Sequence, residues 1–141
     1  EEVIQACREN PNLHYSGLLD KQAVQDLMRR CSMMIFPSIW YEGMPMTLIE
    51  AFAEGTPVLA SNLGAMASMI EDGYNGIHFT AGNSKELAEK MDYWERLSES
   101  EKKIYSEHAR SCFEAHYTPE KSREQILSIY RAVIKNRAGL R

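Results

Sequence analysis

Two apolar runs that flank one helical segment in the first half of the chain constrain its fold more than any other feature. The run at 33–37 is short, apolar and closed by Pro-Ser, which is typical of a buried strand. The segment at 45–54 opens with a proline, which suits the first helical position, and the Gly and Pro that follow it stop the helix. A second strand is expected at 57–61, which completes a strand–helix–strand unit.

The segments around this unit continue the same alternation. They are expected, in chain order, at 1–9 (helix), 13–17 (strand), 21–30 (helix, with Val24, Leu27 and Met28 facing inward), 65–71 (helix) and 76–79 (strand). Strands that alternate with helices are typical of a parallel, doubly wound α/β sheet, which binds its ligand at the carboxyl ends of the strands. We therefore predict this fold class.

From Asn83 onward the chain is predicted to be helical. Asn83 with Glu86, and Ser98 with Glu101, have the spacing of reciprocal helix caps. The last helix is expected to start at 118–119, with an apolar face formed by Ile126, Ile129, Tyr130 and Val133. Because no internal repeat or low-complexity linker interrupts the 141 residues, one domain is expected.

The candidate binding groups lie between the first strand of the central unit and its helix. Glu42 precedes the helix and Glu50 lies inside it, roughly 7 Å along the axis. The free N–H groups between them and the positive end of the helix dipole form an anion site. Two carboxylates repel a bare phosphate but accept hydrogen bonds from hydroxyls. A nucleotide sugar fits this pattern, because its diphosphate lies between sugar hydroxyls and a ribose diol.

The stretch FPSIWYEGMPMTLIEAFAEGTPVLASNLG at 36–64 resembles the Glu-x7-Glu signature of the family-four retaining glycosyltransferases. The likeness continues through MIEDGYNGIHF at 69–79 and covers essentially the whole chain. Members of that family have the GT-B architecture, in which two Rossmann-like domains face each other across a cleft. The resemblance implies that residues 1–141 are the Rossmann-like, nucleotide-sugar donor-binding domain, truncated at its N-terminus and without the acceptor domain.

The resemblance also assigns roles to three side chains. Glu42 would be the catalytic residue and would contact hydroxyls of the transferred sugar. Glu50 would accept both ribose hydroxyls, and Leu19, in a loop that matches the family's base-contacting loop, would lie against the nucleobase. Retaining members are thought to react on the front face of the sugar while the departing diphosphate helps to deprotonate the acceptor. No protein nucleophile and no metal or other cofactor is then expected.

The same resemblance gives the turn before the helix a role through its backbone. The N–H groups of Gly43, Met44 and Met46 would hold the sugar and the diphosphate, and Thr47 completes the substrate-binding turn. Pro45 has no N–H to contribute.

The chain departs from the family pattern in two places. Ala67 and Ser68 stand where the family usually has Pro and Glu, which bears on fine donor specificity. The strand, the Gly-Arg turn and the Lys with which the family's domain opens are not found in the sequence. We therefore interpret the chain as a piece of a larger enzyme and expect the piece alone to be inactive.

Composition excludes several other functions. A net charge of −4 gives no support for nucleic-acid binding. Cys7, Cys31 and Cys112 are odd in number and widely spaced, so neither a disulfide framework nor a zinc site is indicated. A cytoplasmic location fits best, and the inner face of a membrane is left open, because a lipid-linked acceptor would bring a peripheral contact through the absent domain.

The predicted function is transfer of a sugar from a nucleotide-diphosphate sugar to a glycan or lipid-linked acceptor. The first alternative is a non-catalytic nucleotide-sugar-binding module, which acceptor-dependent turnover would exclude. The second is a glycoside hydrolase, whose two carboxylates must face each other across a cleft. A carboxylate on the second turn of a helix suits that poorly. Trp40 and Tyr41 are interpreted as packing residues rather than as a sugar platform.

Overall fold

The central strand β2 (Val58–Ser61) has no exposed residue, and the other elements are arranged around it. The computed structural model describes residues 1–138. Its sheet has three parallel strands in the order β1-β2-β3, where β1 spans Met34–Phe36 and β3 spans Gly76–Phe79. The helices are α1 (Glu2–Glu9), α2 (Lys21–Arg30), α3 (Met46–Ala53), α4 (Gly64–Met69), α5 (Ser84–Arg96), α6 (Glu99–His116) and α7 (Pro119–Ala138).

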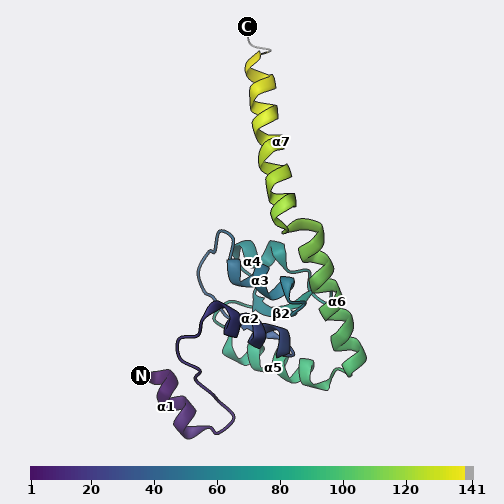
Figure 1. Ribbon diagram of the computed structural model, residues 1–141. Helices are drawn as coiled ribbons and strands as arrows, with labels where there is room; N and C mark the ends of the chain where they lie inside the picture. Colours follow the sequence, from purple (N-terminus) through teal and green to yellow (C-terminus); the bar gives the residue numbers. More distant parts are fainter. Residues whose placement is uncertain (139–141) are drawn as a thin grey trace.

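Successive residues of β2 point to opposite faces of the sheet and belong to two hydrophobic cores. Val58 and Ala60 lie in a core shared with α2, α3, α4 and α6. Leu59 lies in a second core with Ile77, Phe79, Trp94 and Tyr105. Helices therefore cover both faces of the sheet, which confirms the predicted parallel α/β class with helices on two sides (Figure 1).

The second core depends on one aromatic pair and one long-range hydrogen bond. The rings of Trp94 and Tyr105 meet edge to face with their centroids 5.3 Å apart, a favourable geometry for aromatic side chains. The Trp94 indole N–H donates to the hydroxyl of Ser32 at 2.8 Å, which ties α5 to the segment before β1. Burial raises the pKa of the Tyr105 phenol to about 12.

The strand–helix–strand unit and the third strand confirm the sequence prediction closely. Helix α3 begins at Met46 and ends at Ala53, with Pro45 as its N-cap residue, so Pro45 lies one position before the expected one. Strand β1, at one edge of the described sheet, is only half-buried. The prediction of a buried strand there was wrong.

The strand predicted at 13–17 was wrong. The residues of this segment are exposed and form no strand. A strand persists only where a neighbour accepts and donates its ladder hydrogen bonds, and sequence pattern does not report whether that neighbour is present. Leu27 was also wrongly predicted to face inward: it is 47% exposed, and Met28 is the residue of α2 that is buried.

The helix caps were predicted correctly in one case and in part in the other. Ser98 and Glu101 form the reciprocal capping box at the start of α6. Asn83 accepts a hydrogen bond from the N–H of Glu86, as expected. The Glu86 carboxylate, however, accepts from the Thr80 N–H and the Asn83 side chain rather than from the Asn83 backbone.

The C-terminal helix α7 leaves the body of the domain and extends away from it, while α1 lies apart at the other end (Figure 1). The expected apolar face of α7 is present but exposed, with relative accessibilities of 50–61% at Ile126, Ile129, Tyr130 and Val133. Among the described residues, no helix is both long and apolar enough to cross a membrane.

We predict that Gly76→Ala lowers the free energy of unfolding by about 2 to 3 kcal/mol, within the usual range for an overpacked site. A Cβ at Gly76 would lie 2.3 Å from the carbonyl oxygen of Val58, its partner in the parallel ladder, and 3.0 Å from Ile70. The measurement is urea unfolding of both proteins. Gly43→Ala is the matched control because a Cβ there meets no atom within 4 Å. Equal stabilities of the two variants would contradict this account of the ladder.

Candidate active site

Glu42 lies in the loop that connects the carboxyl end of β1 to α3, and its carboxylate is held by a neighbouring hydroxyl. The Ser38 Oγ donates to Glu42 Oε1 at 2.9 Å. The same Ser38 oxygen accepts the N–H of Trp40 at 3.2 Å. Ser38 thus orients the half-buried Glu42 side chain and also fixes the loop backbone at Trp40. Sequence reasoning missed this role, although a Ser four positions before the Glu was visible.

The backbone of Glu42 is fixed from the opposite side by the start of α4. The N–H of Ala65 donates to the carbonyl of Glu42 at 3.3 Å. Gly64 has a positive φ of 54°, and a Cβ there would lie 3.3 Å from the Tyr41 ring and 3.4 Å from the Glu42 carbonyl. Only glycine can adopt this positive φ and leave room for Tyr41 and Glu42 without strain. The loop after β2 therefore positions the loop after β1.

The turn between Glu42 and α3 leaves four backbone donors free. Among residues 1–138, the N–H groups of Gly43, Met44, Met46 and Thr47 donate to no backbone or side-chain acceptor. The first N–H of this helix that finds an acceptor is that of Leu48, bonded to the carbonyl of Pro45. The N-cap residue Pro45 has no side-chain cap to offer. The start of α3 is therefore an uncapped group of donors at the positive end of a helix dipole.

Glu50 lies on α3 between two residues that are buried in the core, Ile49 and Ala51. Its own side chain is half-buried and its carboxylate accepts no hydrogen bond from the described part of the chain. Burying part of a carboxylate without donors costs free energy. A ligand hydroxyl that reached Glu50 would remove this cost, which agrees with a binding role.

Leu19 lies beside α2, immediately before its capping residue Asp20. It is half-buried and lines a cavity of about 320 Å³ together with Ser16, Ala23, Asp26, Leu27 and Arg30. Leu19 thus lines a cavity in the structure. The contact of Leu19 with a nucleobase stays a prediction.

Trp40 and Tyr41, interpreted from the sequence as packing residues, are largely exposed in the structure. The two residues are 74% and 82% exposed, and they directly precede Glu42 in the chain. Their backbone is held by Ser38 and by the Gly64 contact, so their side chains project from a fixed loop. The loop that carries Glu42 therefore also carries two large exposed aromatic side chains.

Ser68, at the position where the resemblance expects a glutamate, does not extend into this turn. Its hydroxyl donates to the carbonyl of Ala65 within α4. Within the described residues, no group of three or more His, Cys, Asp or Glu side chains could hold a metal ion. The groups gathered at this edge are therefore carboxylates, backbone donors and aromatic rings.

Comparison with known proteins identifies the family. A profile described as Glycosyl transferases group 1 matches residues 1–111. The chain belongs to this family. Membership of a transferase family does not favour the glycoside hydrolase alternative.

Individual relatives agree with the family. The chain is 28% identical over 125 residues to N,N'-diacetylbacillosaminyl-diphospho-undecaprenol alpha-1,3-N-acetylgalactosaminyltransferase of Campylobacter jejuni, covering 88% of this chain and 32% of that protein. It is 31% identical over 138 residues to sucrose synthase of Acidithiobacillus caldus, covering 92% and 17%. The chain thus spans about a third or less of the length of these relatives.

Solved structures confirm the Rossmann-like fold. A glycosyltransferase from Rickettsia africae is 26% identical, with a TM-score of 0.81 over 93% of this chain and 35% of that chain. HepE from Anabaena, solved with UDP and glucose, is 22% identical, with a TM-score of 0.80 over 93% and 36%. In both cases the chain corresponds to about one third of the solved protein.

We predict that Met46→Pro weakens binding of inorganic pyrophosphate at this turn by roughly tenfold, about 1.4 kcal/mol for the loss of one donor to an anion. Met46 is the first residue of α3, where proline is tolerated, and Pro45 before it already has an extended ψ of 109°. The substitution therefore removes one N–H and keeps the helix.

Amide chemical shifts of Gly43, Met44 and Thr47 during the titration measure the affinity. Met46→Ala is the matched control because it shortens the side chain and retains the N–H. If both variants bind pyrophosphate equally, the turn does not hold the anion through its backbone.

Proposed function

We propose that this chain is the donor-binding part of a retaining glycosyltransferase that transfers a sugar from a nucleotide-diphosphate sugar to a glycan or lipid-linked acceptor. The observation that carries the proposal is the set of free N–H groups between Glu42 and Glu50. Such a set fits the diphosphate, and a carboxylate at each end fits the hydroxyls of the sugar and of the ribose. Family membership supports the same assignment.

The proposed chemistry assigns each group a simple task. The backbone donors of the turn stabilise negative charge that grows on the diphosphate as the glycosidic bond breaks. Glu42, held by Ser38, orients the transferred sugar through its hydroxyls. Glu50 holds the ribose and so fixes the distance between the nucleoside and the reacting carbon. The acceptor oxygen bonds to the anomeric carbon on the same face from which the diphosphate leaves, and the departing diphosphate takes the acceptor proton. No protein nucleophile is then needed.

The proposed acceptor rests on the name of a relative and not on a residue of this chain. The name of the Campylobacter jejuni relative joins N-acetylgalactosamine transfer to a diphospho-undecaprenol compound, which supports a lipid-linked acceptor as one form for the protein that contains this chain. Such an acceptor would place the intact protein in peripheral contact with the inner face of a membrane.

A panel of UDP, GDP and ADP sugars tests the proposal and selects the donor. Binding by titration, followed by a transfer assay with the intact protein, separates an enzyme from a binding module. Donor binding without acceptor-dependent turnover would support the non-catalytic alternative. Failure of all the nucleotide sugars to bind would overturn the proposal.

Glu42→Ala should lower turnover of the intact enzyme by about 100-fold, which corresponds to about 3 kcal/mol of transition-state stabilisation. The physical reason is the loss of the carboxylate that aligns the sugar. Initial rates at saturating donor measure the effect. Glu89→Ala is the matched control, since Glu89 is an exposed carboxylate on α5. Near-normal turnover of Glu42→Ala would remove this residue from the active site.

Glu50→Gln should weaken donor binding by about 1.5 to 3 kcal/mol, the usual range for hydrogen bonds to a charged group. The substitution keeps the size of the side chain and removes the charge that accepts two hydroxyl protons. Calorimetry with ribose and 2′-deoxyribose donors measures it, with Glu89→Gln as control. The proposed ribose contact predicts that the wild type prefers the ribose donor and that Glu50→Gln loses much of this preference; equal affinities in the wild type would contradict it.

A further inference from the structure

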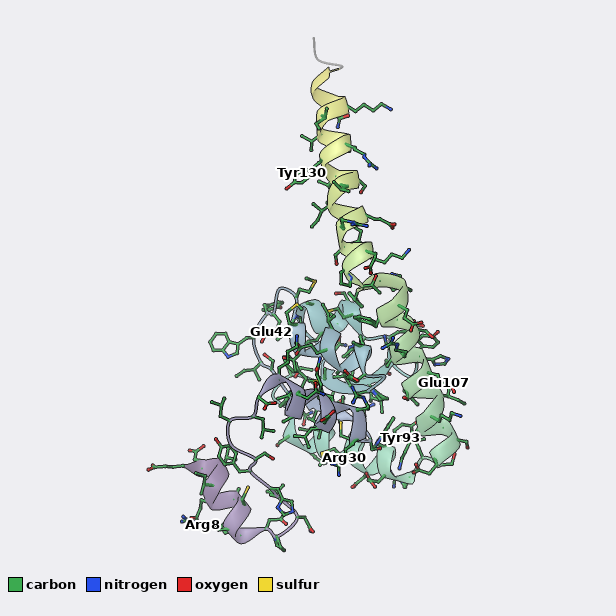
Figure 2. All side chains as sticks on the ribbon, in the orientation of Figure 1. Arg8, Arg30, Glu42, Tyr93, Glu107 and Tyr130 are labelled. Carbon is green, nitrogen blue, oxygen red and sulfur yellow. The ribbon has the colours of Figure 1, made fainter. Side chains whose placement is uncertain are left out.

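A second polar cavity, of about 310 Å³, lies at the edge of the sheet opposite to Glu42. Its walls include Ser32, just before β1, and Pro57, just before β2. Because the strands are parallel, their amino ends meet at one edge and their carboxyl ends, with Glu42, at the other. A strand of four residues spans roughly 13 Å. Figure 2 shows Glu42 and Arg30, another residue of this cavity, at separate places on the body.

The charged side chains around this cavity are predominantly basic, in a chain whose net charge is −4. Four cations and two carboxylates line it, which leaves a local net charge of +2: Arg29, Arg30, Lys102, Lys103, Glu54 and Glu99. One carboxylate, that of Glu54, is already paired with Arg29 at 2.8 Å.

Lys102 distinguishes this cavity from an ordinary solvated surface. Its side chain is only 15% exposed, and its one ion-pair partner among the described residues is Glu99, at 3.3 Å. The Glu99 side chain is 93% exposed, so water screens its charge. A largely buried cation with a solvated partner has an incompletely compensated charge. Arg30 forms no ion pair with any residue of the described chain.

Each hydroxyl group of the cavity wall forms a hydrogen bond within the protein. Ser106 donates to the carbonyl of Gly55 at 2.6 Å, and Thr56 donates to the carbonyl of Met28 at 2.6 Å. The hydroxyl of Ser32 accepts the Trp94 indole N–H. These bonds fix the walls. Lys103 is paired with Glu107 at 3.7 Å, and both of these side chains are exposed. Arg30 and Lys102 are therefore the main side chains available to donate to a ligand.

We propose that this cavity binds a phosphoryl group, carried either by a small soluble phosphate ester or by the headgroup of an anionic lipid. A lysine ammonium and an arginine fork are the side chains that recognise phosphate oxygens through charge-assisted hydrogen bonds. The volume fits a small phosphorylated molecule rather than an extended polymer. This cavity shares no residue with the turn at Gly43 to Thr47, and Arg30 is the one residue that it shares with the cavity beside Leu19. Lys102 does not line the cavity beside Leu19, so the Lys102 variants test this site separately from the proposed transferase function.

The test is a titration of the chain with inorganic phosphate at low salt, followed by amide chemical shifts. We expect the shifts of Cys31, Ser32, Gly55 and Thr56 to change with phosphate concentration. Arg30→Gln and Lys102→Gln should each weaken binding at least about fivefold, and Lys102→Arg, which keeps the charge, should weaken it less than Lys102→Gln. Lys85→Gln, at an exposed lysine of α5, should leave the affinity unchanged.

Co-sedimentation with vesicles distinguishes the two sources of the phosphoryl group. Binding to phosphatidylglycerol vesicles but not to phosphatidylcholine vesicles, lost in Arg30→Gln, would assign a lipid headgroup. Phosphate binding without vesicle binding would assign a soluble ester. If Lys102→Gln does not fold, the exposed Arg30 variant alone decides the result.

The proposal is overturned if neither phosphate nor anionic vesicles bind at this edge. It is also overturned if every variant binds as the wild type does. Shifts confined to Gly43, Met44, Met46 and Thr47 would show that phosphate reaches only the turn before α3.

Discussion

The complete burial of β2 is the constraint on which the rest of the structure depends. Its four residues have no exposed surface and supply side chains to two separate cores, so helices must cover both faces of the sheet. At roughly 1.5 to 3 kcal/mol for each large apolar side chain removed from water, neither core can be left open. Gly76 then lets β3 approach so closely that a methyl group would overlap the ladder. This packing holds the three strands in register and so places their carboxyl ends, which carry the loops of the candidate site.

The candidate site uses the ends of the strands rather than their interiors. The loop after β1 carries Glu42, and the start of α4, after β2, holds the backbone of that residue through Gly64 and Ala65. Two loops on neighbouring parallel strands thus support each other at the carboxyl edge, where open α/β sheets bind ligands. The amino edge presents a different chemistry, with lysine and arginine around a fixed polar wall.

Local signals explain why much of the fold could be predicted from the sequence. The Pro and Gly around α3, the apolar run of β2 and the Ser98–Glu101 cap each depend on residues a few positions apart. The errors have non-local causes. Residues 13–17 alternate like a strand but have no ladder partner, and the exposure of Trp40 and Tyr41 depends on how a loop leaves the sheet. Ser38 was overlooked because its contact with Glu42 is a side-chain geometry that spacing alone does not reveal.

The missing cap of α3 has a consequence for the folding of the whole domain. Helix starts are normally completed by a side chain of the same protein, worth about 0.5 to 2 kcal/mol, and Pro45 supplies none. An anion bound at this turn completes the helix from outside, so the free energy of binding becomes part of the free energy of folding. If the nucleotide sugar proposed above binds at this turn, the domain should melt at a temperature that rises with the concentration of that ligand, and loss of the ligand should make the domain more accessible to proteolysis.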